Sequence, residues 1–350
     1  MNGIRFVHTD DLRLGGSIAG LAAAPDWLRR LARDSTRGAV SKVFDIASTR
    51  NADFVFIGGS CTECDEFRSS VRQWLEKPLR WLRQQGIRIV MAASPLSETE
   101  HLADFVVHPN ERLYVTRSTD GVRFEICGPT DLPKESDLAL SPESVGISTH
   151  VTCNYLFSPQ LRHTVRTTQD KVPVYSAGAP QSHSPQEQGE FGCLVVNAIP
   201  GTGQMDVAFE PTDPLRFEIH KIDSSSVVTS QDVCDVIVTK SRILARQQRR
   251  STVVDWHFET PLECAGEIES WPQETILNSV RTALQEGHLG VWPRRIEMDP
   301  SSVLLAGELD SAGERELTSL LFEQQRESKP LADGLFSELV TGARLLRRAA

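Results

Sequence analysis

The sequence lacks long apolar runs. No stretch of its 350 residues approaches the roughly 20 apolar residues that a membrane-spanning helix needs. The first residues also lack a basic segment followed by an apolar run, the pattern of a secretory signal. We therefore expect a cytoplasmic protein with no membrane contact.

Signs of a disulfide framework or of a repeat architecture are missing as well. The seven cysteines are an odd number, and they are scattered and stand mostly beside apolar residues. Such cysteines are typical of small buried side chains. We find no internal repeat or low-complexity tract. The content of 39% hydrophobic and 24% charged residues is that of an ordinary globular protein, long enough for two domains.

Positive charge is in deficit, and the net charge of −10 opposes nonspecific attraction to nucleic acid. Any contact with DNA must therefore come from a local basic patch or from a partner. In a predicted helix at about 230–248, Arg242, Arg246 and Arg249 fall on roughly one face and are the candidate nucleic-acid contacts. A solvated helix face is the simpler explanation of the same pattern.

The first part of the chain alternates strands and helices. Short buried strands are expected at Ile4–Val7, Phe54–Ile57 and Ile87–Met91. Ser35 or Thr36 is expected to cap the first helix, and the second covers about 67–85 and ends at Gly86. This order predicts parallel strands with crossover helices and a site in the loops at the carboxyl ends of the strands. The chain then becomes strand-rich, which predicts a second stacked sheet.

We divide the chain into three parts. Glycine and proline interrupt the pattern near 200–204, so the first domain is expected at 1–205, or to end shortly after a strand at Val207–Phe209. Residues 206–300 again alternate strands and helices, which predicts a small α/β domain. Residues 301–350 have leucines at helical spacings and are expected to form a helical tail. The predicted fold class is α/β, or α+β.

The most informative stretch is His8-Thr9-Asp10-Asp11-Leu12-Arg13-Leu14-Gly15. It resembles the opening metal motif of a two-metal phosphoesterase, in which an aspartate and a histidine two residues later follow the first strand. Asp11 matches the aspartate of that motif. Arg13 stands at the histidine position, and a guanidinium has no lone pair to offer a metal.

Further segments extend this resemblance over nearly the whole chain. They are Ser17–Leu21, Asp34–Arg37, Ala52–Gly59, Tyr175–Gln181 and Glu187–Cys193. With them, the chain resembles the SbcD-type nuclease subunits, in particular the YhaO-like branch. These calcineurin-like metallophosphoesterases work in DNA repair with an SbcC-type ATPase. The resemblance implies a four-layer, two-sheet sandwich flanked by helices, a small α/β capping domain and a helical C-terminal tail.

The family's chemistry needs two metal ions, roughly 3.5–4 Å apart, with ligands from five loops. Two ligand positions remain, Asp11 in the first loop and His150 in the fourth. In the fifth loop, His163 is at best a displaced survivor. The resemblance therefore implies Asp11, His150 and His163 as residual metal ligands.

The other ligand positions have changed. Besides Arg13, Ser60 stands where the family has the aspartate that bridges both metals. In the third loop, Ser94 and Pro95 stand within the segment where the family has an asparagine ligand and a catalytic histidine. Four losses at roughly 10–100-fold each imply a deficit of about 10⁴–10⁸ in metal affinity or rate, on the order of 5–11 kcal/mol.

These losses favour a catalytically inactive, SbcD-like subunit with no cofactor. It would act as a scaffold or partner of an SbcC-like coiled-coil ATPase, with the C-terminal helices as the docking element. The alternative is a divergent metal-dependent exonuclease or phosphoesterase that uses manganese or another divalent metal. Contact with DNA and a homodimer are left open.

Two local alternatives concern the emptied motifs. In the loop Cys61-Thr62-Glu63-Cys64-Asp65, a cysteine or carboxylate could replace the lost bridge and form a single zinc site with His150 or His163. Arg13 could instead fill the vacant pocket in place of a cation. The second hypothesis requires Arg13 to point into the pocket near Asp11 or His150, and an Arg13 directed to bulk solvent would defeat it.

Overall fold

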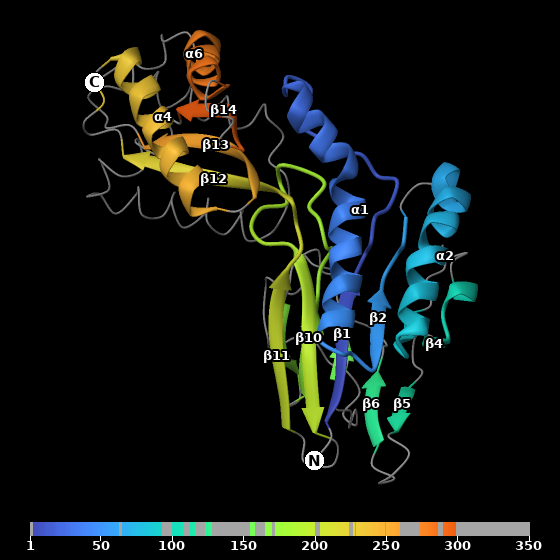
Figure 1. The fold of residues 1–350 in the computed structure, drawn as a ribbon. Helices are drawn as coiled ribbons and strands as arrows, with labels where there is room; N and C mark the ends of the chain where they lie inside the picture. Colours follow the sequence, from blue (N-terminus) through green and yellow to red (C-terminus); the bar gives the residue numbers. More distant parts are fainter. Residues whose placement is uncertain are drawn as a thin grey trace, which may run out of the picture.

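A large module built on a six-stranded sheet and a smaller module built on a three-stranded sheet make up the molecule (Figure 1). The computed structural model describes residues 3–62, 65–92, 100–107, 112–116, 123–127, 155–157, 165–169, 172–199, 204–223, 227, 229–248, 250–259, 273–285 and 290–298. The two modules meet at the first turns of helix α1, where Leu21, Ala24 and Leu28 pack against Phe217 and Trp292.

The six-stranded sheet has the order β11-β10-β1-β2-β3-β4. Its strands are β1 (Ile4–Asp10), β2 (Phe54–Gly58), β3 (Arg88–Ala92), β4 (Phe105–Val107), β10 (Gly192–Ile199) and β11 (Gln204–Pro211). Strands β1 to β4 are parallel, and β10 is antiparallel to β1. The register pairs Asp10 with Gly58, so the carboxyl ends of β1 and β2 lie side by side.

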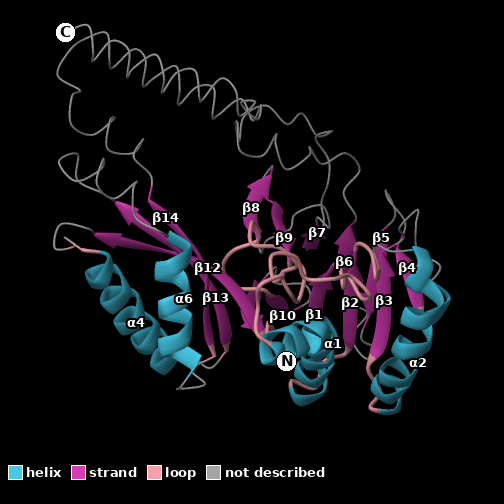
Figure 2. Ribbon diagram, turned by 90° about the horizontal axis from the view of Figure 1, so that it is seen from above, coloured by secondary structure: helices cyan, strands magenta, loops and turns pink. Residues whose placement is uncertain are grey.

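Helices α1 (Asp26–Thr49) and α2 (Arg68–Gln84) cover one face of this sheet (Figures 1 and 2). Their buried apolar side chains share one core cluster with β1, β2 and β3. The short 3-10 turn η1 (Asp65–Phe67) precedes α2, and a second, η2 (Glu100–Leu102), precedes β4. The prediction for α2 is confirmed, including its end at Gly86, which has a positive φ of 80°.

The predicted start of α1 at Ser35 or Thr36 is wrong. The helix begins directly after Pro25, which supplies the extended residue before its first turn. Ser35 lies inside the helix and donates a hydrogen bond from Oγ to the carbonyl oxygen of Ala32 (2.8 Å). The first turns pack Leu28 against the smaller module rather than against the large sheet, so no regular apolar period marks them in the sequence.

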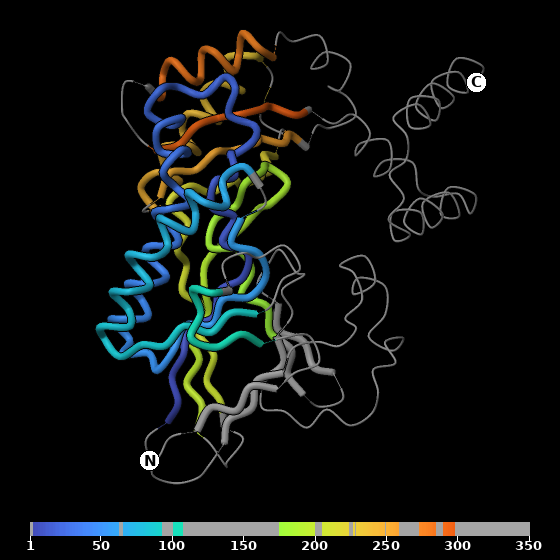
Figure 3. The backbone as a smooth tube through the Cα atoms, turned by 90° about the vertical axis from the view of Figure 1, so that its right-hand side faces the viewer, coloured from blue at the N-terminus to red at the C-terminus, as the bar shows by residue number. Residues whose placement is uncertain are grey.

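A five-stranded sheet with the order β5-β6-β7-β9-β8 forms the second layer of strands. Its strands are β5 (Arg112–Thr116), β6 (Arg123–Cys127), β7 (Tyr155–Phe157), β8 (Val165–Gln169) and β9 (Val172–Ser176). Tyr175 of β9 and the adjacent Ala177 pack in one cluster with Phe6, Phe56 and Leu194, on the face of the large sheet opposite to the helices. Figure 2 shows the labelled strands of this second sheet beside those of the first, and the tube in Figure 3 shows the smaller module, in yellow to red, at one end of the large one. The prediction of two stacked sheets is thereby confirmed.

The smaller module contains β12 (Leu215–Asp223), α4 (Ser230–Gln247), β13 (Ser251–Glu259), α6 (Gln273–Gln285) and β14 (Val291–Met298). Its three strands are parallel in the order β12-β13-β14, and both helices pack on them around Trp256. A capping box starts α4, in which Thr229 and Asp232 satisfy each other's backbone N–H groups.

The predicted α/β fold class is therefore confirmed. Since β11 still pairs with β10 and β12 opens the smaller sheet, the chain passes from one module to the other between Pro211 and Leu215. The expected tail at 301–350 lies outside the described residues, and the fourth layer stays a prediction. No helix in the described part of the chain is long and apolar enough to cross a bilayer.

Candidate functional site

The end of β1 is fixed by a buried histidine and carboxylate. His8 Nε2 and Asp10 Oδ1 are 2.8 Å apart, and both side chains are fully buried. The other oxygen, Oδ2, accepts hydrogen bonds from the backbone N–H groups of Ala177 (2.8 Å) and Gly178 (3.3 Å) and from the hydroxyl of Ser176 (3.2 Å). Asp10 thus ties the end of β1 to the loop after β9. This role of Asp10 was not predicted, although the adjacent pair Asp10-Asp11 was a signal for it in the sequence.

The first two motif loops are joined through Asp11. Its backbone has a positive φ of 37°, and its N–H donates to the carbonyl oxygen of Gly58 (3.0 Å). Its Oδ1 accepts a hydrogen bond from the backbone N–H of Ser60 (2.8 Å). The Ser60 hydroxyl donates to the carbonyl oxygen of Thr62 (2.6 Å). The structure therefore brings the predicted positions Asp11 and Ser60 together. The hydrogen bonds of Asp11 to Gly58 and Ser60 hold the loop after β1 to the loop after β2.

Arg13 is directed into the protein and forms an ion pair with Glu187. Its Nη1 lies 2.8 and 2.9 Å from the two carboxylate oxygens, and the side chains are only 11% and 4% exposed. Glu187 also accepts a hydrogen bond from the backbone N–H of His183 (2.6 Å). An Arg13 side chain in bulk solvent would have defeated the hypothesis that its guanidinium takes the place of a cation. The side chain does not lie in bulk solvent. In the sequence, Glu187 stood out only as the first residue of the segment Glu187–Cys193 that extends the resemblance.

The described ligand positions do not fit a two-metal centre. Of Asp11, Arg13 and Ser60, only the first offers an anionic oxygen, and the second is a fixed cation. Within the residues that the structure describes, no group of three or more histidine, cysteine, aspartate or glutamate side chains is placed to hold a metal ion.

Several predicted site residues lie outside the described parts of the chain, namely Ser94, Pro95, His150 and His163. The zinc alternative for the loop at 61–65 has the same status, because Glu63, Cys64 and the side chain of Asp65 are not described. Cys61 itself is buried beside the core of the large sheet.

The predicted nucleic-acid contacts lie on the smaller module. Arg242 and Arg246 are exposed on α4, and Ile243 between them is 48% exposed. Helix α4 ends at Gln247, and Arg249 lies outside the described residues, so a face shared by all three arginines stays a prediction. Their contact with nucleic acid stays a prediction.

Comparison with protein-family models and with curated proteins found no match. Among solved structures, the chain is similar to TT1561 of Thermus thermophilus. The sequence identity is 9% and the TM-score is 0.32, and the similarity covers 59% of this chain and 99% of that protein.

Proposed function

We propose that this chain is a catalytically inactive, SbcD-like phosphoesterase-fold subunit of the cytoplasm that serves as a scaffold or partner of an SbcC-like ATPase in DNA repair. The observation that carries the proposal is the buried ion pair of Arg13 and Glu187. At the position where the resemblance expects a neutral metal ligand, this chain has a permanent positive charge with a carboxylate of its own.

The energetics of this pair oppose a divalent cation. For a metal to approach the first motif, Arg13 would have to leave Glu187, which is only 4% exposed. Separating a buried pair costs about 3–5 kcal/mol, because each charge is left without its counter-charge. At 1.4 kcal/mol per decade, this cost corresponds to roughly a hundredfold to several-thousandfold in affinity. This cost adds to the loss of affinity from the missing histidine and aspartate ligands.

The first experiment measures metal content and nuclease activity together. Purified protein is dialysed against manganese, analysed for bound metal and incubated with linear DNA, beside an active SbcD-type nuclease as a positive control. We expect far less than one manganese ion per chain and no cleavage above the buffer blank. Stoichiometric metal, with cleavage that His150→Ala abolishes, would instead establish the alternative of a divergent metal-dependent exonuclease.

A second experiment addresses the partner. The tagged chain is co-expressed with a long coiled-coil ATPase encoded beside it and purified by the tag. The proposal predicts a complex of fixed stoichiometry that also forms with the Asp11→Ala variant, since binding does not depend on a metal site. If no such gene exists and no ATPase co-purifies, the scaffold role is rejected.

A further inference from the structure

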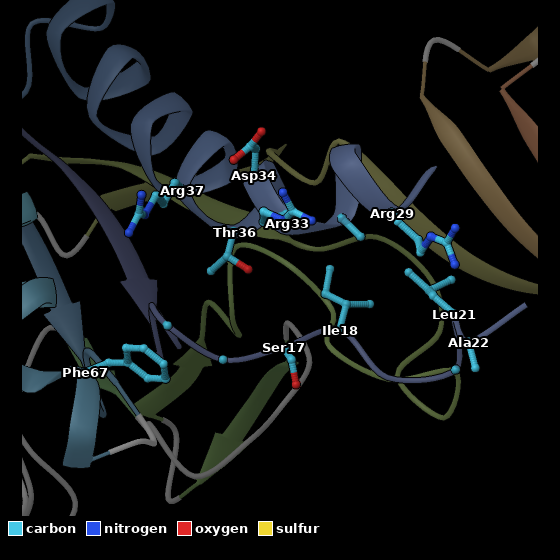
Figure 4. A pocket seen from close by; sticks show the side chains of 14 residues that line it. Ser17, Ile18, Leu21, Ala22, Arg29, Arg33, Asp34, Thr36, Arg37 and Phe67 are labelled. Atoms are coloured by element: carbon cyan, nitrogen blue, oxygen red, sulfur yellow. The ribbon is translucent and has the colours of Figure 1, made fainter. Parts of the chain in front are cut away.

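A groove opens where the first motif ends, between the loop at residues 15–22 and the first half of α1 (Figure 4). Its volume is about 670 Å³, which lies within the range of pockets that hold small organic ligands. The resemblance to phosphoesterases assigns no role to this groove. We propose that it binds a nucleotide, with the phosphates on Arg33 and Arg37 and the base against Phe67.

The charge of the groove is the first support. Arg29, Arg33 and Arg37 follow one another at intervals of four residues, so they lie along one side of the helix, about 6 Å apart in rise. Among the described residues that line the groove, Asp34 is the one with an acidic side chain. This local excess of positive charge stands out in a chain with a net charge of −10.

The arginines differ in their availability. Arg29 pairs with Asp26 at 2.5 Å on the surface. In the described part of the chain, neither Arg33 nor Arg37 has an ion-pair partner, and both side chains are exposed. Guanidinium groups are suited to phosphate because their N–H donors match two oxygens at once. These two side chains are therefore free to bind an anion.

An aromatic ring at the same end is the second support. Phe67 packs its Cβ side against Gly15, where an added Cβ would lie 2.9 Å from it, and yet the residue remains 43% exposed. In Figure 4, Phe67 and Arg37 lie at one end of the groove and Arg29 at the other. An exposed ring at the same end of a groove as a guanidinium offers a stacking surface for a base and a contact for its phosphate.

The glycines of the loop do not add to this argument. An added Cβ at Gly16 would lie 2.9 Å from the His183 ring, and one at Gly20 would lie 2.5 Å from Pro185. Packing alone therefore requires glycine at these positions. The proposal depends on the arginines and Phe67, which the packing of the fold leaves exposed.

The test is calorimetric titration of the full chain, without metal, with ATP, inorganic triphosphate, an oligothymidylate and polyglutamate. The variants are Arg33→Gln, Arg37→Gln and Phe67→Leu, and Arg30→Gln is the matched control, because Arg30 is exposed on α1 but does not line the groove. Circular dichroism verifies that each variant is folded. Since the assay needs neither nuclease activity nor the ATPase, its result is independent of the proposed function.

We expect ATP and the oligothymidylate to bind, with Arg33→Gln and Arg37→Gln each weakening both about tenfold to a hundredfold. Phe67→Leu should weaken them roughly tenfold and leave triphosphate binding unchanged, and Arg30→Gln should change nothing. If the oligothymidylate binds more tightly than ATP, the source of the nucleotide is a DNA strand. If ATP binds as tightly or more tightly, the source is a free nucleotide. The proposal is overturned if neither binds, if Arg30→Gln has the same effect as Arg37→Gln, or if triphosphate or polyglutamate binds as tightly as ATP.

Discussion

Removal of the Glu187 carboxylate should destabilise the large module strongly. In Glu187→Ala, Arg13 loses both short contacts to the carboxylate, and the backbone N–H of His183 loses its acceptor. Because the paired side chains are 11% and 4% exposed, solvent screens the remaining charge poorly. Breaking a buried pair of this kind typically costs about 3–5 kcal/mol. Glu187→Gln keeps one acceptor oxygen and should cost less, about 1.5–3 kcal/mol.

A double-mutant cycle isolates the pair from the packing of its side chains. The four proteins are the natural chain, Arg13→Met, Glu187→Leu and the double variant, and the assay is urea unfolding followed by tryptophan fluorescence. We expect a coupling energy of about 2–3 kcal/mol. The double variant should be more stable than either single variant, since two apolar side chains replace a charge pair without leaving either charge unpaired.

The matched control is the ion pair of Arg72 and Glu76 on the surface of α2. Its atoms are 3.4 Å apart, and its side chains are 54% and 42% exposed. Glu76→Ala should therefore change the free energy of unfolding by about 0.5 kcal/mol or less. A coupling energy between positions 13 and 187 that is as small as this control would refute the reasoning, because the pair would then contribute no more than a solvated one.

Three further predictions concern other parts of the fold. Gly58→Ala should destabilise the chain by more than about 2 kcal/mol in urea unfolding, because the new Cβ would lie 2.0 Å from Asp10 Oδ1. Its control is Gly38→Ala on α1, where the new Cβ meets no atom within 4 Å and should stabilise the chain by about 0.5–1 kcal/mol. Thr229→Ala removes the capping box of α4 and should cost about 1 kcal/mol in the same assay. Burial raises the pKa of the Cys193 thiol from 9.0 to about 12. The native thiol should therefore resist iodoacetamide at pH 9 by mass spectrometry. Because its folded pKa is the higher one, its contribution to stability is complete below pH 9 and is lost as the pH rises toward 12.

Local signals predicted the elements whose partners are close in the sequence. The apolar period and Gly86 placed α2 correctly, and the ends of β1 and β2 brought Asp11 and Ser60 together as parallel strands require. The first turns of α1 were missed, because Leu28 packs on strands of the other module.

The charged pairs of the site were beyond the reach of such signals. Arg13 and Glu187 are separated by 174 positions, and one sequence gives no indication of which carboxylate a given arginine will meet. The motif resemblance predicted that Arg13 stands at the position of a metal ligand. It did not reveal the residue that balances the new charge.

The charged side chains at and after the end of β1 each have a partner within the protein. Asp10 is held by His8 and backbone N–H groups, and Glu187 faces Arg13 within the protein. Arg13 without Glu187 would lose the carboxylate that faces it, and Arg13→His alone would take from Glu187 the guanidinium that faces it. Each step costs several kcal/mol of the roughly 5–15 kcal/mol that typically keeps a domain folded. A change at only one of the two positions therefore weakens the fold, and the pair holds the end of β1 in its present arrangement.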